Sequence, residues 1–155
     1  MMQVNIYVET DIRSLKKHER TVMYLLECRI RGMPITKNGM FMRSGSLHEC
    51  ILEGITKALG RVVKPSSITI FTSDSMLLDM IGYYLPEWVT QDFRKKNGEE
   101  IANRDLWMEF YDRAHEHSIL THRGGHEYRN WMLSEMKRKK EEDEGNNRGS
   151  DIQHN

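Results

Sequence analysis

The sequence has few of the residues that would mark particular classes of protein. Its 155 residues include two cysteines, Cys28 and Cys50, and neither has a second cysteine or a histidine at the spacing of a four-ligand zinc site. We therefore expect both thiols to be reduced, as is usual in the cytoplasm. No apolar run approaches the roughly 20 residues that a membrane-spanning helix needs. We expect no membrane association and a cytoplasmic location.

The chain also lacks net charge, because 23 Lys and Arg balance 23 Asp and Glu. This balance argues against binding nucleic acid through bulk electrostatics alone. The charges are unevenly distributed, however: residues 1–64 carry 11 basic against 6 acidic side chains (+5), and residues 65–155 carry 12 against 17 (−5). Solvated surface charges would explain any one of the basic residues equally well. A phosphate-binding face would use Arg13, Lys16, Lys17, Arg20, Arg29, Arg31 or Arg43.

The first half of the chain predicts strands followed by a helix. With 38% hydrophobic residues, a chain of this length forms one domain with a core of its own. Alternation of apolar and polar residues predicts three antiparallel strands. From Leu47 the apolar period changes to that of a helix, which Pro65 ends, and a short buried strand follows. The predicted strands cover residues 4–10, 21–31, 35–42 and 68–72.

The second half predicts alternating helices and one further strand. Pro86 limits an apolar helix over 75–84, and a polar loop containing Asn97-Gly98 covers 90–102. A helix over 104–117 and a strand over 118–121 come next. The last helix runs from 127 to about 144, so we expect one domain over 1–144 and a disordered polar tail over 145–155. Strands followed by alternating helices and strands indicate an α/β protein with a mixed sheet.

Several short motifs follow one another along the chain: "ITIFTSDS" at 68–75, "NRDLW" at 103–107, and Gly125-His126 followed by Asn130. Their order resembles that of the ribonuclease H family. The segment "QVNIYVET" resembles the first strand of that family, with Glu9 where an aspartate is usual. The resemblance covers roughly residues 3–136 and rests on order and spacing, since each motif alone is common. It implies a ribonuclease H-like mixed five-stranded sheet with helices on both faces.

The resemblance also implies a reaction. The family hydrolyses the RNA strand of RNA/DNA hybrids with two Mg²⁺ (or Mn²⁺) ions, which require several converging carboxylates. Asp74 matches the Thr-Asp-Ser position, although Ser73 intervenes, and its alternative role is to cap the following helix. Glu9 would supply the first-strand carboxylate. Asp11, two residues on and on the same side of the strand, is the alternative.

The two remaining carboxylates of the family are harder to assign. The approach to the first helix, "SGSLHE", assigns Glu49, whereas the apolar stripe assigns Ile51, which cannot bind a metal. Glu49 has an alternative role too, because Ser46 and Glu49 have the spacing of a capping box. The fourth position is Ser134 where the family has aspartate. The adjacent Glu135, rotated by about 100°, would need a helix shift to bind the metal.

The resemblance also implies a role for two histidines, and two functions of the chain remain open. His122 and His126 lie in the loop "THRGGHEYRN", where the family uses a histidine for proton transfer; the alternative is that each only binds backbone. One function is a metal-dependent phosphodiester hydrolase acting on RNA/DNA hybrids, and cleavage of DNA would use the same fold and metals. The other is a catalytically degenerate fold that binds nucleic acid or a protein.

Overall fold

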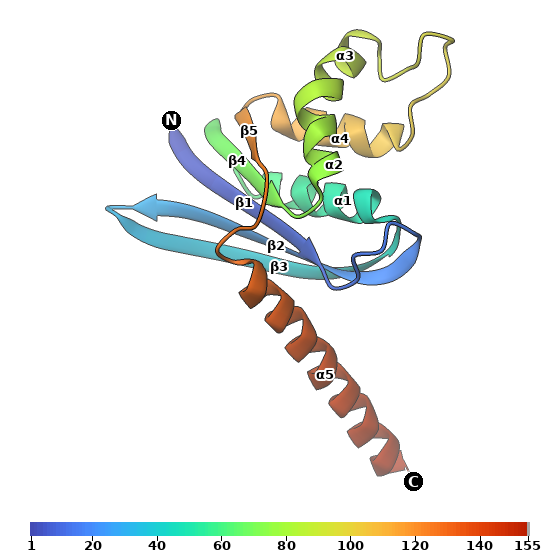
Figure 1. Ribbon diagram of the computed structural model, residues 1–155. Helices are drawn as coiled ribbons and strands as arrows, with labels where there is room; N and C mark the ends of the chain where they lie inside the picture. Colours follow the sequence, from blue (N-terminus) through green and yellow to red (C-terminus); the bar gives the residue numbers. More distant parts are fainter. Residues whose placement is uncertain (155) are drawn as a thin grey trace.

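The structure is a computed structural model that describes residues 1–154, with side chains described as far as residue 146. Its centre is a five-stranded sheet of order β3-β2-β1-β4-β5 (Figure 1). The first three strands are antiparallel, whereas β4 and β5 run parallel to β1. The strands are β1 (Met2–Thr10), β2 (His18–Ile30), β3 (Met33–Gly45), β4 (Ser66–Thr72) and β5 (Ser118–His122). The predicted mixed α/β sheet is confirmed.

Helices cover both faces of this sheet, as expected (Figure 1). On one face α1 packs on β1 and β2 and against α4. On the other face the long C-terminal helix α5 contacts β1 and β2 and then projects away from the sheet. The helices are α1 (Leu47–Leu59), α2 (Ser75–Asp79), the π-helical turn η1 (Met80–Tyr84), α3 (Leu85–Thr90), α4 (Arg104–Ala114) and α5 (Arg129–His154).

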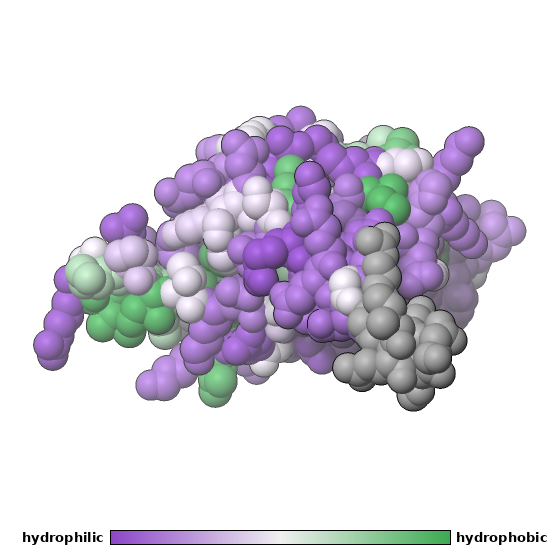
Figure 2. All heavy atoms as spheres, turned by 90° about the horizontal axis from the view of Figure 1, so that it is seen from below, coloured by the Kyte–Doolittle hydropathy of each residue, from purple (hydrophilic) through white to green (hydrophobic). Residues whose placement is uncertain are grey.

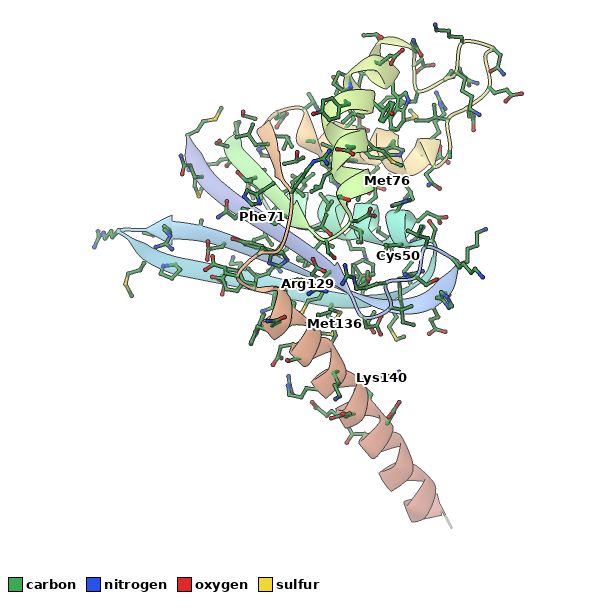
Figure 3. All side chains as sticks on the ribbon, viewed as in Figure 1. Cys50, Phe71, Met76, Arg129, Met136 and Lys140 are labelled. Atoms are coloured by element: carbon green, nitrogen blue, oxygen red, sulfur yellow. The ribbon has the colours of Figure 1, made fainter. Side chains whose placement is uncertain are left out.

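The alternation along β1 explains its central place. Val4, Ile6 and Val8 point toward α1 and are almost fully buried. Tyr7 points to the opposite face, where it joins a smaller apolar cluster with Met132 and Met136 of α5, labelled in part in Figure 3. Because β1 is buried on both faces, the residues at its carboxyl end are held in a rigid frame.

The chain departs from the sequence prediction at several helix ends. α1 ends at Leu59, before Pro65, and α4 ends at Ala114 instead of His117. Pro86 does not end a helix; it lies in the first turn of α3, where a missing N–H has no cost. The backbone of α5 is helical to His154, beyond the expected end near Glu144. The side chains after residue 146 and residue 155 lie outside the described part, so the disordered tail over 145–155 stays a prediction. No helix in the described part of the chain is both long and apolar enough to cross a membrane.

Candidate functional site: two carboxylate–histidine pairs at the ends of β1 and β4

The carboxyl ends of β1 and β4 form one edge of the sheet. The two strands are parallel neighbours, and Val8 lies opposite Thr72 in their register. Glu9 follows Val8 directly, and Ser73 and Asp74 follow Thr72, so the register brings these polar residues together. Glu9 and Asp74 are both buried, with exposed fractions of 0% and 5%. Buried carboxylates need partners, and those partners define the site.

Glu9 is bound by donors on both carboxylate oxygens. The Ser73 amide donates to Oε1 at 2.9 Å and the Ser73 hydroxyl donates to Oε2 at 2.7 Å. The Nε2 atom of His126 lies 3.2 Å from Oε1. The His126 side chain is 1% exposed, and its Nδ1 accepts from the Tyr128 amide. Glu9 and His126 are therefore a buried pair whose polar atoms are all engaged by the protein.

Asp74 is bound in a similar way by a histidine from α1. Its Oδ1 accepts a hydrogen bond from the Leu77 amide, at 3.1 Å, so Asp74 caps α2 as its alternative role required. Its Oδ2 lies 2.5 Å from Nδ1 of His48. The hydrogen bond to Asp74 raises the pKa of His48, against the opposing effect of burial. The edge thus carries two pairs, Glu9–His126 and Asp74–His48, joined through Ser73.

Glu49 is not brought to this edge. Its amide donates to the Ser46 hydroxyl at 3.3 Å, and that hydroxyl donates to Glu49 Oε1 at 3.1 Å, so Ser46 caps α1 and also binds the Glu49 side chain. Arg43 binds the other oxygen at 3.2 Å. Burial alone would raise the pKa of Glu49, but the hydrogen bonds from Arg43 and Ser46 outweigh it and lower the pKa. Since Glu49 serves its own helix end, the α1 residue that reaches Asp74 is His48. Ile51 is buried in the core.

The remaining predicted residues also lie elsewhere. Glu135 pairs with Arg138 at 3.0 Å on the surface of α5. Asp11 accepts from the Thr21 amide at 2.9 Å and closes the β1–β2 turn. His122 is exposed and its ring lies against Phe71, 5.0 Å between ring centroids. Ser134, at the position of the fourth carboxylate, is exposed. Of the predicted set, the structure therefore unites Glu9, Asp74 and His126.

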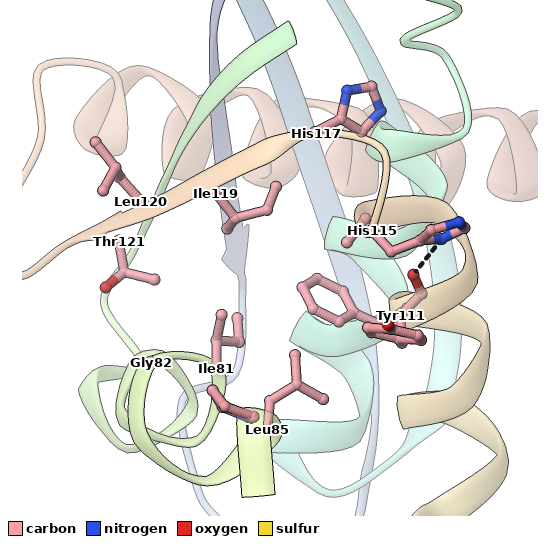
Figure 4. Close-up of a pocket in the computed structure, with 12 residues that line it drawn as sticks. Ile81, Gly82, Leu85, Tyr111, His115, His117, Ile119, Leu120 and Thr121 are labelled. Atoms are coloured by element: carbon pink, nitrogen blue, oxygen red, sulfur yellow. Dashed lines mark hydrogen bonds between the residues drawn. The ribbon is translucent and has the colours of Figure 1, made fainter. Parts of the chain in front are cut away.

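A separate cavity of about 440 Å³ lies between η1, α3, α4 and β5 (Figure 4). Its lining is largely apolar, with Ile81, Leu85 and Ile119 among the wall residues, and includes no carboxylate. The ring of His115 is directed to the backbone, with Nδ1 2.8 Å from the Asp112 carbonyl oxygen. The cavity offers no convergent acid and base, so the strand-end pairs remain the candidate site.

The comparisons with known proteins agree with this architecture. No family model matches the chain. Ribonuclease H of Rickettsia bellii is 30% identical over 64 residues, 41% of each chain. The crystal structure of LC9-RNase H1, a type 1 RNase H with the type 2 active-site motif, matches with a TM-score of 0.66 at 15% identity, over 80% of this chain and 63% of that one. The chain has a ribonuclease H-like fold.

A similar fold also occurs within a larger protein. The foamy viral protease-reverse transcriptase in complex with RNA/DNA hybrid matches with a TM-score of 0.61 at 10% identity, over 87% of this chain and 19% of that one. Sequence identities of 10–15% to these solved structures show a shared fold and nothing about function. The sequence match spans about two fifths of the length of the ribonuclease H from Rickettsia bellii. The family resemblance is thus confirmed, whereas activity is a separate question.

The donor set of this ribonuclease H-like protein does not fit two magnesium ions. Magnesium prefers several hard oxygen ligands, and the edge supplies two carboxylates whose four oxygens are already bound by Ser73, His126, Leu77 and His48. No group of three or more His, Cys, Asp or Glu in the described residues is arranged to hold a metal ion. The expectation of a metal bound by Glu9, Glu49, Asp74 and Glu135 is therefore unsupported by this geometry.

Two residues of the ribonuclease H-like site were missed from the sequence. His48 is adjacent to Glu49, and the signal that could have identified it is the capping box itself. If Glu49 occupies the third helical position and turns back to Ser46, the second position is free to face the strand ends. Ser73 interrupts the Thr-Asp-Ser pattern, and no local signal shows that its amide and hydroxyl would both bind Glu9.

Proposed function

We propose that this ribonuclease H-like protein binds nucleic acid, with RNA/DNA hybrid as the first ligand to test, and that its acidic centre is degenerate for two-metal cleavage. The observation that carries this proposal is the pairing of Glu9 with His126 and of Asp74 with His48. Each imidazole lies where a cation would have to approach the carboxylate. Glu49 and Glu135 do not converge on this edge, which supports the same conclusion, because two carboxylates would have to bind the metal ions that four carboxylates bind in the family.

Nucleic acid as the ligand is supported by the fold and by a basic loop. The similar foamy viral protein was solved in complex with RNA/DNA hybrid. In this chain the loop between β1 and β2 starts two residues after Glu9 and carries Arg13, Lys16 and Lys17, all exposed. None of these three side chains is within ion-pair distance of a carboxylate in the part of the chain that the structure describes. Free cations beside the strand ends suit the phosphates of a bound duplex.

The second candidate is weak metal-dependent hydrolysis of the same hybrid with Mg²⁺ or Mn²⁺. It is favoured by Glu9 and Asp74, which keep acidic groups at the ends of two adjacent parallel strands. For cleavage, both histidines would have to leave their carboxylates. Loss of two buried charge-assisted hydrogen bonds makes that rearrangement costly, which is why binding is preferred as the primary function.

One experiment separates the two candidates. A fluorescently labelled RNA/DNA hybrid is titrated with the protein, and anisotropy is followed at several salt concentrations. The Lys16→Glu/Lys17→Glu variant should bind more weakly, with a salt slope smaller by about 2, because each phosphate contact contributes about 0.9. The matched control is Lys95→Glu/Lys96→Glu, which changes two exposed lysines of the 90–102 loop and should bind as the wild type does.

The same samples are incubated with Mg²⁺ or Mn²⁺ and the strands are resolved on a gel. Binding without cleavage supports the proposal. Cleavage that disappears in Asp74→Asn would instead establish the hydrolase and identify Asp74 as part of its site. Equal binding by the wild type and the Lys16→Glu/Lys17→Glu variant, or no binding by a folded protein, contradicts the proposed nucleic-acid role.

A further inference from the structure

The face of the sheet under α1 is only partly covered by that helix. The 13 residues of α1 make a helix about 20 Å long, whereas the 13 residues of β2 or β3 span roughly 43 Å. α1 starts directly after the end of β3 and runs back along the hairpin. The chain beyond its end reaches only the middle of β3, where Arg61 donates to the carbonyl oxygen of Asn38. The tip of the β2–β3 hairpin therefore extends past α1 (Figure 1).

The uncovered part of this face keeps the apolar pattern of the core. Cys28 pairs with Val4 on one side and with Ile35 on the other, and Ile30 pairs with Met33. Partners across a sheet point to the same face, and Val4 is part of the core under α1. Ile30, Met33 and Ile35 are 52%, 68% and 42% exposed. The core layer thus continues along the hairpin without a helix to cover it.

A groove follows from this geometry. A cavity of about 410 Å³ lies between the strand ends and the segment 61–64 after α1, where Val63 is 89% exposed. We call this surface, formed by Ile30, Ile35, Val63 and their neighbours, the hairpin-end groove. Figure 2 shows hydrophobic side chains gathered toward the hairpin end of the molecule, next to hydrophilic ones. Contiguous exposed apolar surface of this kind marks interaction sites.

The rim of the hairpin-end groove is basic. Its exposed cations have no ion-pair partner among the described residues, whereas the exposed Arg113 pairs with Glu109 and Arg138 pairs with Glu135. The carboxylate in the groove lining, Glu27, is buried and bound by Tyr128 and Asn5. The rim cations are Lys37, Arg61 and Lys64.

We propose that the hairpin-end groove docks an amphipathic helix of a partner protein that has an aliphatic stripe flanked by Asp and Glu. A helix placed there would continue the layer that α1 begins and would bury Ile30 and Ile35, as helix-in-groove complexes do. Acidic side chains beside the stripe would pair with the unpaired rim cations. A nucleic acid fits less well, because the exposed side chains of the groove are aliphatic and cannot stack with bases.

The probe for this proposal is a synthetic labelled peptide of about 18 residues, or five helical turns. Leucines at i, i+3, i+4 and i+7 form its stripe, and glutamates flank the stripe. The matched peptide has the same leucines with lysine in place of every glutamate. Anisotropy titrations use the full chain, and the glutamate peptide should bind at least tenfold more tightly than the lysine peptide. Equal affinities would overturn the proposal.

Two groove variants locate the binding. Ile30→Thr/Ile35→Thr removes apolar surface but keeps β-branched residues in the strands, and Arg61→Glu/Lys64→Glu reverses the rim charge. Each should weaken binding of the glutamate peptide roughly tenfold or more. Thermal unfolding by circular dichroism verifies that both variants are folded. If the peptide binds the folded groove variants as tightly as it binds the wild type, the site lies elsewhere and the proposal is wrong.

Matched controls and competing ligands complete the experiment. Met42→Thr changes an exposed methionine, 63% exposed, near the other end of β3, and Lys95→Glu/Lys96→Glu changes distant lysines; neither should alter peptide binding. RNA/DNA hybrid and vesicles of phosphatidylserine and phosphatidylcholine are titrated in parallel. If the groove variants lose hybrid or vesicle binding instead of peptide binding, the groove binds that ligand and the proposal is wrong. A dimer that is lost in Ile30→Thr/Ile35→Thr, seen by sedimentation, would assign the groove to a second copy of the chain.

Discussion

Replacing Glu9 with alanine distinguishes a carboxylate that stabilises the fold from one that is held for chemistry. Glu9 is fully buried and accepts two hydrogen bonds from Ser73, at 2.9 and 2.7 Å, with His126 3.2 Å away. Alanine would leave the Ser73 amide and His126 without partners, and each unsatisfied buried group costs about 1–3 kcal/mol. Removing one partner of a buried pair typically costs 3–5 kcal/mol, so we expect the free energy of unfolding to fall by about that amount.

The assay is urea unfolding at pH 7, followed by circular dichroism and tryptophan fluorescence. Glu109→Ala is the control, since it removes a surface carboxylate, 53% exposed, that pairs with Arg113, and it should cost less than about 1 kcal/mol. Glu9→Gln keeps the shape and the acceptor for the amide, so its loss should be intermediate. If Glu9→Ala is as stable as the wild type or more stable, the structural role is refuted. The carboxylate would then be held at a cost to stability, as functional groups often are, and the hydrolase would regain support.

Three further outcomes follow from the packing around the site. Gly54→Ala in α1 should lower the free energy of unfolding in the urea titration by about 1–3 kcal/mol, because its new Cβ would lie 2.7 and 2.9 Å from valine methyls of β1 and β2. The control is Gly82→Ala in η1, where nothing lies within 4 Å of the new Cβ. It should be neutral or stabilise the protein by up to about 1 kcal/mol. Ser46→Ala should cost about 1 kcal/mol through loss of the α1 cap, and an unchanged midpoint would contradict the role of Ser46 as that cap. Because Asp74 raises the pKa of His48 above its ordinary value of 6.5, that pair stabilises the folded state fully below pH 6.5 and loses this contribution as the pH rises through the raised pKa. Urea titrations from pH 5.5 to 9 should therefore show a decline above pH 6.5 that is absent in His48→Asn; parallel profiles would contradict the pairing.

Much of the fold could be predicted from the sequence because its signals are local. Alternation marked β1, a short apolar run marked β4, helical periodicity marked α1, and the polar stretch after residue 90 lies outside the main helices and strands. Pro86 was misread because a proline signal does not say whether a helix ends before it or starts around it. Proline lacks a backbone N–H whether it follows a helix or lies in the first turn of one, so the sequence signal is the same in both cases. The packing of Leu85 into the core decides between them.

The candidate site was predicted only in part. Glu9, Asp74 and His126 were identified because they follow recognisable strands or a recognisable loop. Glu49 was weighed only against Ile51 because a carboxylate was expected, and its neighbour His48 was not considered, although the spacing of Ser46 and Glu49 already offered Glu49 a local partner. One position along a helix is a rotation of about 100°, so the choice between adjacent residues decides which side chain faces the strand ends.

By itself, the sequence determined the order of the helices and strands, the ribonuclease H-like arrangement and the presence of acidic groups at two strand ends. These features depend on periodicity, capping and turn residues, which act over a few positions of the chain. Only the tertiary structure decided that Glu9 and Asp74 are each paired with a histidine and that the hairpin tip extends past α1. Both facts depend on which residues from distant segments meet, and on element lengths in space: Glu9 and His126 are 117 positions apart, and a strand rises more than twice as far per residue as a helix.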